Sequence, residues 1–353
     1  MVNEMLGVEK KVKVYDFFSG CGGTSCGLEQ AGFEISMALD IDRKALDTFS
    51  LNFPDAAIVH GDICSMSPQD IALHIGARKD FLLFSGCAPC QPFSKQNNQK
   101  SANDPRRSLL TKFGEFVEYW LPDFLLIENV PGLQKANTAG PFGAFLELLK
   151  GNGYCYDYKV VPAAGYGVPQ KRERLVLVAS RLSEISVPPL SHGPDLSLEY
   201  TTVRDWISGL SPLCAGGIDP EDPDHQAASL SEINLKRIRS TPEGGSRESW
   251  PEELWLDCHK GHKGHTDVYG RLSWDKPASG LTTRCISLSN GRFGHPAEDR
   301  ALSVREAACL QTFPRSFRFT GTLGDKAKQV GNAVPPLMAT KLAQSFIDKL
   351  ASY

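Results

Sequence analysis

The sequence predicts an α/β fold built on a doubly wound, mostly parallel sheet, with a second, smaller and loop-rich domain. Short apolar runs alternate with helix-like stretches through the first half of the chain, which is typical of strands joined by crossover helices. From Ser180 to about Thr320, prolines and glycines become frequent and helical periodicity weakens, which indicates loops with short strands.

The first apolar run, Val12 to Phe18, predicts a strand, and a helix is expected to follow through about Ala31, with Gly32 suited to its C-terminal cap. A second strand is predicted from Glu34 to Leu39, and a second helix from Arg43 to about Leu51. The remaining apolar runs predict strands at 58–60, 81–84, 124–127, 159–161 and 175–179.

The tail of the chain, Leu337 to Leu350, has the spacing of an amphipathic helix. With 353 residues, 41% hydrophobic and 22% charged, the composition is ordinary for a soluble globular protein. No stretch approaches the roughly 18 apolar residues of a membrane span, and the first residues lack the layout of a secretion signal, so a cytoplasmic location is expected. The ten scattered cysteines are expected to be thiols, and the net charge of −3 does not decide for or against nucleic acid.

Polar, glycine-bearing or reactive segments follow five of the predicted strands, at 16–23, 40–42, 61–63, 85–91 and 128–130. Ligands of doubly wound sheets bind outside the carboxyl ends of the strands, so these segments predict one site. The glycines of the first segment form G-x-G-G, not the dinucleotide pattern, and a plain tight turn is an alternative. Asp40 or Asp42 suits ribose hydroxyls, and Asp62 could accept a hydrogen bond from a purine amine, so a nucleoside-bearing cofactor is favoured.

Two cysteine-containing motifs have competing interpretations. Cys87-Ala-Pro-Cys90 has the form of a dithiol redox pair, although the chain is far longer than such an oxidoreductase needs. A zinc site there would need two further ligands, and no second C-x-x-C supplies them. Cys258 to His265 carries three histidines, but its glycines and lysines favour a loop on phosphates or plain surface over a metal site. No metal is expected.

Six motifs, in order, resemble those of the DNA (cytosine-5)-methyltransferases of the bacterial or phage modification type. They are D-F-F-S-G-C-G-G from Asp16, P-C-Q from Pro89, E-N-V from Glu128, Q-K-R-E-R from Gln170, the segment Arg300 to Pro314, and Q-V-G-N-A-V-P-P from Gln329. The resemblance covers nearly the whole chain outside residues ~185–270. It implies a Rossmann-like methyltransferase fold that uses S-adenosyl-L-methionine.

The resemblance also implies the catalytic residues, which are Cys90, Gln91, Glu128, Asn129, Arg172 and Arg174. Cys90 would add to C6 of cytosine as a thiolate. Glu128 would engage N3 and the exocyclic amine, and Asn129 would help to hold the nucleophile loop. Arg174 and Arg172 would contact O2 and neighbouring groups. Cys87 would then only pack at the end of its strand.

The cofactor-binding residues that the resemblance implies are Asp16, Phe18, Gly20, Gly22, Gly23, Asp40, Ile41, Asp62, Ile63, Asn332 and Ala333. Asn332 is expected near the methionine end. Asp40 stands where the family commonly has glutamate, so Asp42 could share the ribose. Ile41 replaces an aromatic residue that often stacks on adenine, which leaves only an apolar contact.

Double-stranded DNA is the implied partner, with the target base flipped out at a cost of a few kcal/mol. The polar segment 93–107 resembles the family's mobile loop, and the recognition region would supply further contacts, mostly to phosphates. The DNA-binding residues expected are Ser94, Lys95, Gln96, Arg106, Arg237, Lys260, Lys263, Arg271 and Arg292.

The implied catalytic and cofactor-binding domain comprises residues 1–184 plus 322–353, and residues 185–321 form a small domain with the target-recognition region. DNA would lie between the two, bound by a monomer, and a cognate restriction endonuclease often accompanies such enzymes. A tRNA-cytosine methyltransferase of the same family is the alternative, but its characteristic C-F-T tripeptide is absent from the sequence. A DNA-binding protein with a dead active site would be expected to have lost a catalytic residue, and none is lost. The sequence does not reveal the target sequence.

Overall fold

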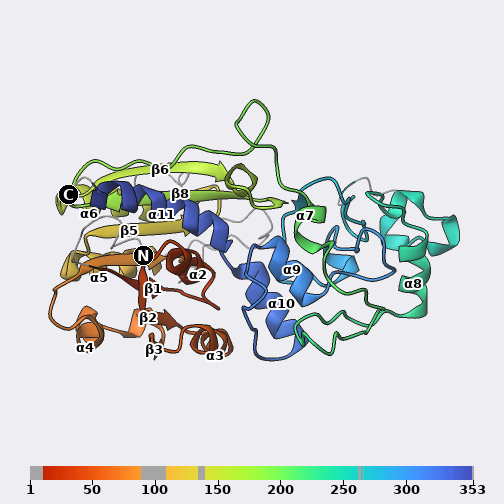
Figure 1. Ribbon diagram of the computed structural model, residues 1–353, viewed down its shortest axis with the longest axis horizontal. Coiled ribbons are helices and arrows are strands. Elements are labelled where there is room, and N and C mark those ends of the chain that lie inside the picture. The colour runs from red at the N-terminus through yellow and green to blue at the C-terminus, as the bar shows by residue number, and fades with distance from the viewer. Residues whose placement is uncertain (1–10, 89–108, 134–139, 261–263, 265, 352–353) are drawn as a thin grey trace. The chain divides into compact units, whose positions relative to one another are not determined.

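The computed structural model describes residues 11–88, 109–133, 140–260, 264 and 266–351. The chain divides into two compact units (Figure 1). Unit 1 comprises Met1–Pro162, Glu173–Leu190 and Val334–Tyr353, and unit 2 comprises Ala163–Arg172 and Ser191–Ala333. Each unit is therefore assembled from separate stretches of the chain.

Unit 1 is built on a seven-stranded sheet with the order β3-β2-β1-β4-β5-β8-β6. Its strands are β1 Val12–Phe17, β2 Glu34–Asp40, β3 Ala57–His60, β4 Phe81–Gly86, β5 Phe124–Asn129, β6 Cys155–Pro162 and β8 Glu173–Ser180. The first five strands pair in parallel, whereas β8 runs antiparallel to both β5 and β6. The prediction of a doubly wound, mostly parallel sheet is confirmed.

The helices of unit 1 are α2 Gly23–Gln30, α3 Arg43–Asn52, α4 Ala72–Ile75, α5 Leu109–Trp120, α6 Pro141–Gly151 and α11 Pro336–Ala351, with the 3-10 turns η1 Ile63–Ser65 and η2 Pro68–Ile71. The predicted first, second and last helices are confirmed. Gly32 has φ +91° and donates its N–H to the Glu29 carbonyl, as expected of a helix cap. In the described part of the chain, no helix is long and apolar enough to cross a membrane.

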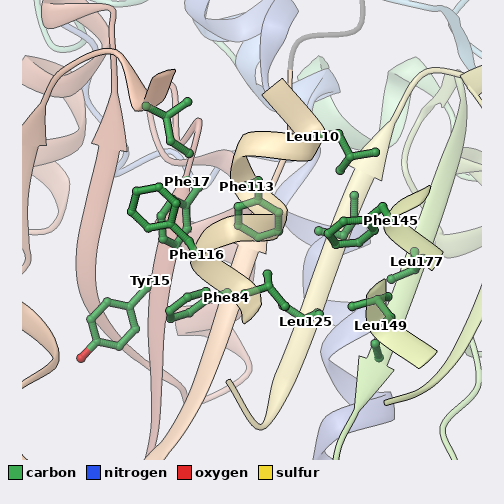
Figure 2. Packing of buried hydrophobic residues seen from close by; sticks show 14 of the residues in the cluster. Tyr15, Phe17, Phe84, Leu110, Phe113, Phe116, Leu125, Phe145, Leu149 and Leu177 are labelled. Atoms are coloured by element: carbon green, nitrogen blue, oxygen red, sulfur yellow. The ribbon is translucent and has the colours of Figure 1, made fainter. Parts of the chain in front are cut away.

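Two layers of helices cover the sheet of unit 1. On one face, alternate strand residues pack against α5 and α6 in a core rich in aromatic rings (Figure 2). The rings and side chains labelled in that view include Tyr15, Phe17, Phe84, Phe113, Phe116, Leu125, Phe145, Leu149 and Leu177. On the other face, α2 and α11 lie side by side (Figure 1). Their backbones approach closely at Gly27, where a Cβ would lie 2.2 Å from the Pro336 carbonyl oxygen.

The strand order places a topological switch between β1 and β4. The chain winds outward from β1 to β2 and β3, and then returns to β4 on the other side of β1. The two strands pair in parallel, with Phe17 beside Gly86 at their carboxyl ends. Ligands of doubly wound sheets bind at such a point. The glycine-rich segment and the cysteine-containing segment both begin there.

Unit 2 contains short helices joined by long connections. Its helices are α7 Val203–Ile207, α8 Glu232–Arg239, α9 Val304–Leu310 and α10 Leu323–Asn332, with the 3-10 turns η6 Ala163–Tyr166, η7 Arg247–Ser249, η8 Glu252–Leu254, η9 Asp257–His259 and η10 Leu288–Asn290. A two-stranded parallel ladder joins β7, Gln170–Lys171, to β9, Ala278–Ser279. The ladder ties the short stretch 163–172 to the rest of the unit.

A buried ion pair supports the helix α9. Arg300 donates from both terminal nitrogens to the carboxylate of Glu306, at 2.7 Å each, and the two side chains are 0% and 2% exposed. Glu306 also accepts from the backbone N–H of Ser303 in a capping box. Burial by itself would raise the pKa of Glu306, but hydrogen bonding and the charge of Arg300 lower it. Unit 2 therefore relies on a charged interior as well as on apolar packing.

Candidate active site

The glycine-rich loop after β1 owes its shape to left-handed residues. Phe18, Gly20 and Gly22 have φ of +58°, +54° and +97°. A Cβ on Gly22 would lie 2.6 Å from the ring of Phe53, so only glycine fits there, whereas a Cβ on Gly20 would meet nothing within 4 Å. A left-handed phenylalanine is strained, and such strain is concentrated at functional sites. Helix α2 begins directly afterwards, at Gly23.

Asp40 connects the end of β2 to this loop. Its Oδ2 accepts from the backbone N–H of Gly20 at 2.8 Å, and its Oδ1 accepts from that of Asp42 at 2.8 Å. Burial raises the pKa of Asp40. Asp42 caps helix α3 by accepting from the N–H groups of Lys44 and Ala45. Between them, Ile41 is 66% exposed, so an apolar side chain stands open beside the two carboxylates.

The segment after β3 lies next to Asp40, because Gly61 donates its N–H to the Asp40 backbone carbonyl. Asp62 is exposed, and its Oδ1 accepts from the N–H of Cys64 at 2.9 Å. Ile63 is 2% exposed and belongs to the core of unit 1. A cofactor contact through the Ile63 side chain is therefore not supported, because that side chain is fully used in packing.

Asp16 lies beneath the loop, in the interior at the end of β1. Its Oδ2 accepts from the Ser25 hydroxyl at 2.6 Å, and the nearby Ser85 hydroxyl also lowers the pKa of Asp16, although its geometry falls short of a full hydrogen bond to Oδ1. Burial raises the pKa of Asp16 to about 7. Asp16 is thus an interior acid that links β1 to the first turn of α2. Ser25 was not anticipated from the sequence, where only the polar first turn of that helix hinted at it.

Glu128 and Arg174 are brought together from the adjacent strands β5 and β8. Arg174 Nε lies 2.6 Å from Glu128 Oε1, and the two side chains are 15% and 11% exposed, respectively. The contact is an ion pair whose N–H is not aligned well enough for a hydrogen bond to that oxygen. Arg174 Nη1 donates instead to the Glu173 carbonyl at 2.7 Å. The arginine is therefore fixed in place, and a carboxylate oxygen remains to serve a ligand.

Asn129, next to Glu128, holds the segment that follows β4. Its Nδ2 donates to the Ala88 carbonyl at 3.0 Å, and its Oδ1 accepts from the N–H of Val130 at 2.8 Å. Cys87 in that segment has its thiol 3.5 Å from the Thr24 hydroxyl. Burial, and then the charge of Glu128, raise the pKa of Cys87 well above its ordinary value. Cys87 is therefore a neutral thiol near pH 7. Cys90, three positions on, and Gln91 lie outside the described residues.

Three further predicted residues belong to unit 2. Arg172 is buried, and its Nη1 donates to the carbonyls of Leu281 and Gly331, at 3.2 and 3.1 Å. Asn332 is exposed at the end of α10, and the carbonyl of Ala333 accepts from the Gln311 side chain. Arg172 thus joins three segments of its own unit.

Two arginines predicted to bind DNA are buried in unit 2. Arg271 is 4% exposed and donates to the carbonyls of Thr241, His295 and Ile238, at 2.6, 2.8 and 2.9 Å. Arg237 is also buried, donating to the Leu254 carbonyl at 3.0 Å. Both guanidinium groups donate to interior oxygen atoms, and that these two side chains contact phosphate stays a prediction.

The other predicted DNA contacts are placed differently. Arg292 pairs with Asp267 at 2.9 Å and donates to the Gly244 carbonyl, so much of its guanidinium is engaged. Lys260 is on the surface, 3.0 Å from Asp257. Ser94, Lys95, Gln96, Arg106 and Lys263 lie outside the described residues. Within the described ranges, no group of three or more histidine, cysteine and acidic side chains could hold a metal ion.

Comparison with known proteins agrees with this geometry. The model of the C-5 cytosine-specific DNA methylases matches residues 12–348. A type II methylase, M.HgiDII of Herpetosiphon aurantiacus, is 40% identical over 339 residues, which are 94% of each chain. The type II methyltransferase M1.HphI of Haemophilus parahaemolyticus is 34% identical, over 94% of this chain and 86% of its own.

Solved structures show the same fold. An E. coli prophage protein assigned as a DNA modification methyltransferase superposes with a TM-score of 0.77 at 25% identity, over 96% of this chain and 99% of its own. DNMT2 of Spodoptera frugiperda superposes with a TM-score of 0.64 at 18% identity, over 95% of this chain and 99% of its own. Because the family model spans nearly the whole chain, the protein belongs to the C-5 cytosine-specific DNA methylases.

Proposed function

We propose that the enzyme transfers a methyl group from S-adenosyl-L-methionine to C5 of a flipped-out cytosine in a specific duplex DNA sequence. The observation that carries this is the ion pair of Glu128 and Arg174, which stands beside the segment that leads to Cys90. A carboxylate and a guanidinium held together offer hydrogen bonds to the edge of a cytosine ring. The substrate base, the nucleophile and the cofactor would thus meet at the carboxyl ends of β1, β4 and β5.

The cofactor crevice fits a nucleoside with an attached amino acid. The exposed Ile41 offers an apolar surface to an adenine, and the neighbouring Asp40 and exposed Asp62 offer acceptors for hydroxyl and amine groups. The open space at Gly20 lets a ligand approach the loop backbone. When bound, S-adenosyl-L-methionine supplies an electrophilic methyl group. Asn332 and Ala333, in unit 2, stay predicted cofactor contacts.

Cys90 is proposed to start the reaction by adding to C6 as a thiolate. The thiolate would supply the electron pair of the new S–C6 bond, and the displaced electrons of the C5=C6 bond would be stabilised by a proton that the Glu128 carboxyl donates to N3. C5 would then attack the methyl group as its bond to the sulfonium sulfur breaks, leaving S-adenosyl-L-homocysteine. A base would remove the proton from C5, and the S–C6 bond would break to release Cys90 and 5-methylcytosine. Arg174 would donate a hydrogen bond to O2 of the ring. Arg172 would act indirectly, through its hydrogen bonds to other segments of unit 2.

The choice of Cys90 over Cys87 rests on protonation. Attack needs a thiolate, and the surroundings of Cys87 strongly favour its neutral form. Glu128 is one cause of this, because a second negative charge close to its carboxylate is unfavourable. Asn129 holds the backbone at Ala88 and thereby sets the direction in which the chain leaves towards Cys90. Cys87 is thus a packing residue in this proposal.

The test is methyl transfer from labelled S-adenosyl-L-methionine by the purified chain. Duplex DNA carrying many sequences should become labelled, and tRNA should not. Cys90→Ser should abolish labelling while retaining cofactor and DNA binding, whereas the matched control Cys87→Ala should keep most of the activity. Labelled tRNA with unlabelled DNA would refute the substrate, and an active Cys90→Ser with an inactive Cys87→Ala would refute the mechanism.

The biological setting is proposed from the relatives. Two relatives that span most of this chain are named type II methylases, which supports a modification enzyme that accompanies a restriction endonuclease. A monomer acting in the cytoplasm is the simplest form of such an enzyme. Bisulfite sequencing of DNA from cells that express the chain would reveal the target sequence and the modified cytosine. Unchanged DNA in cells that contain the folded protein would contradict the proposal.

A further inference from the structure

Arg284 differs from the other described arginines of unit 2. Each of the others donates to a carboxylate or to a carbonyl, as Arg271, Arg292 and Arg305 illustrate. The remaining partnered arginines are Arg172, Arg204, Arg237, Arg239, Arg247, Arg300, Arg315 and Arg318. Arg284 is exposed, and its side chain forms no hydrogen bond or ion pair with the described residues. Its charge is therefore available to a ligand.

Arg284 lines a hollow of about 440 Å³ in the surface of unit 2. The other lining residues are Thr283, Ile286, Ser287, Gly324, Ala327 and Lys328. The lining is mostly apolar, with two cations and two hydroxyl-bearing side chains among its residues and no acidic side chain. A concentration of positive charge with hydroxyl donors is the chemistry that binds phosphate.

The backbone around Arg284 is held rigidly against α10. The N–H of Arg284 donates to the Thr282 hydroxyl, and its carbonyl accepts from the N–H of Ser287. Cys285 is buried, with its sulfur 3.7 Å from the Ala327 carbonyl in α10. A Cβ on Gly331 would lie only 2.2 Å from the Thr282 carbonyl oxygen, so the turn and the helix touch backbone to backbone. The guanidinium thus extends from a fixed base, which reduces the entropy lost on binding.

A second hollow, of about 250 Å³, adjoins the first along the turn that contains Ile286 and Ser287. Its other lining residues are Ala228, Ser229, Leu230, Asn234, Leu288 and Ser289, none of them charged. The positive charge is therefore confined to the first hollow. The second hollow is neutral and its lining is more apolar than polar, so a phosphate is expected in the first hollow and not in the second.

We propose that the hollow at Arg284 binds a phosphate of the DNA backbone, with Arg284 as its principal ligand and Lys328 as its neighbour. This inference rests on the proposed function, because it assumes that duplex DNA is the substrate. Thr283 and Ser287 would add neutral hydrogen bonds to the same group. The contact positions the duplex on unit 2 and carries no sequence information by itself.

The test compares Arg284→Gln with Arg204→Gln in the full chain. Arg204 is also an exposed arginine of unit 2, but Asp275 pairs with it at 2.6 Å and it lines neither hollow. Affinity for a duplex that the wild type methylates is measured by fluorescence anisotropy from 0.05 to 0.3 M salt. Loss of one phosphate contact should reduce the magnitude of the slope of log K, where K is the association constant, against log salt concentration by about 0.9. A tenfold rise in salt concentration should therefore weaken the binding of the variant by about eightfold less than that of the wild type.

Arg284→Gln is expected to show that loss, with cofactor affinity and melting temperature unchanged, and Arg284→Lys should recover part of it. Lys328→Gln should add a smaller effect, and Arg204→Gln should bind as the wild type does. An unchanged salt slope in Arg284→Gln, with a wild type that binds and methylates DNA, overturns this inference alone. Binding of inorganic phosphate or a mononucleotide at the hollow without any effect on DNA would likewise overturn it. A wild type that neither binds nor methylates DNA refutes the proposed function itself.

Discussion

Asp16 gives the stability of unit 1 a pH dependence opposite to that of most carboxylates. Its pKa is raised by burial from an ordinary value of 3.8 to about 7. Between these values the folded state keeps a proton that the unfolded state has released, so the free energy of unfolding falls as the pH rises. At about 1.4 kcal/mol per pKa unit, this shift lowers the free energy of unfolding by about 4 kcal/mol in total as the pH rises past both pKa values. About 2 to 3 kcal/mol of this decrease falls between pH 5 and pH 8.

Asp16→Asn tests this directly, because asparagine has nearly the same shape and does not ionise. Its oxygen can still accept from the Ser25 hydroxyl, which lies 2.6 Å from the carboxylate in the wild type. Its amide can donate to the hydroxyl of Ser85, the neighbour of Asp16 across the sheet, which in the wild type interacts with the carboxylate. The variant is therefore expected to be more stable than the wild type at pH 8, with the advantage shrinking towards pH 5.

The measurement is urea unfolding at pH 5 and pH 8 for the wild type, for Asp16→Asn, and for Asp55→Asn as an exposed control in the same unit. Subtracting the variant from the wild type removes the contributions of all other titrating groups. The control should lose as much stability as the wild type over this range. Equal losses in the wild type and in Asp16→Asn would refute the reasoning.

Three other substitutions probe separate features. Asn129→Ala should lower kcat about tenfold or more, because the buried hydrogen bond from Asn129 to the Ala88 carbonyl is lost. The cofactor Kd should stay the same. An unchanged kcat would argue against a role of Asn129 in positioning the segment that leads to Cys90. Glu306→Gln should cost about 3 to 5 kcal/mol in chemical unfolding at pH 7, because it leaves the buried Arg300 without its main counter-charge, and a loss below about 1 kcal/mol would contradict this. Gly27→Ala should lower the melting temperature although alanine is the better helix former, because the added methyl would lie 2.2 Å from the Pro336 carbonyl oxygen. A raised melting temperature would show that α11 moves aside at little cost.

The sheet and the place of the site could be predicted from the sequence because both depend on local patterns. Apolar runs alternating with helices specify strands and crossovers, and their order of pairing puts the ends of β1 and β4 side by side. The neighbourhood of Glu128 and Arg174 was expected only through the resemblance. In the structure it follows from the pairing of β5 with β8, which no local pattern specifies.

The roles of the cations in unit 2 could not be predicted in this way. Arg271 looks like a surface cation in the sequence, yet it is buried because carbonyls from two other segments, the end of α8 and the stretch at His295, converge on it. Arg284 lies in a polar stretch with no distinguishing pattern, yet among the described arginines of unit 2 its side chain is the one without a hydrogen bond or ion pair. Whether an arginine is buried depends on whether the folded chain brings unpaired carbonyl groups from distant segments close to its guanidinium. The residues next to the arginine in the sequence do not indicate this.

The ladder between β7 and β9 limits how new DNA specificities can arise in this architecture. Gln170 in β7 donates to the Leu310 carbonyl and accepts from the N–H of Leu281, so residues 163–172 and the stretch after about residue 278 have to be inherited together. Recombination between relatives could exchange residues from Ser191 to about residue 277 without breaking these bonds. An exchange that crossed β9 would separate two halves of one hydrogen-bonded network. An exchangeable segment would therefore have to be shorter than unit 2, and it would have to keep Asp222 and Asp224, which pair with the buried Arg305.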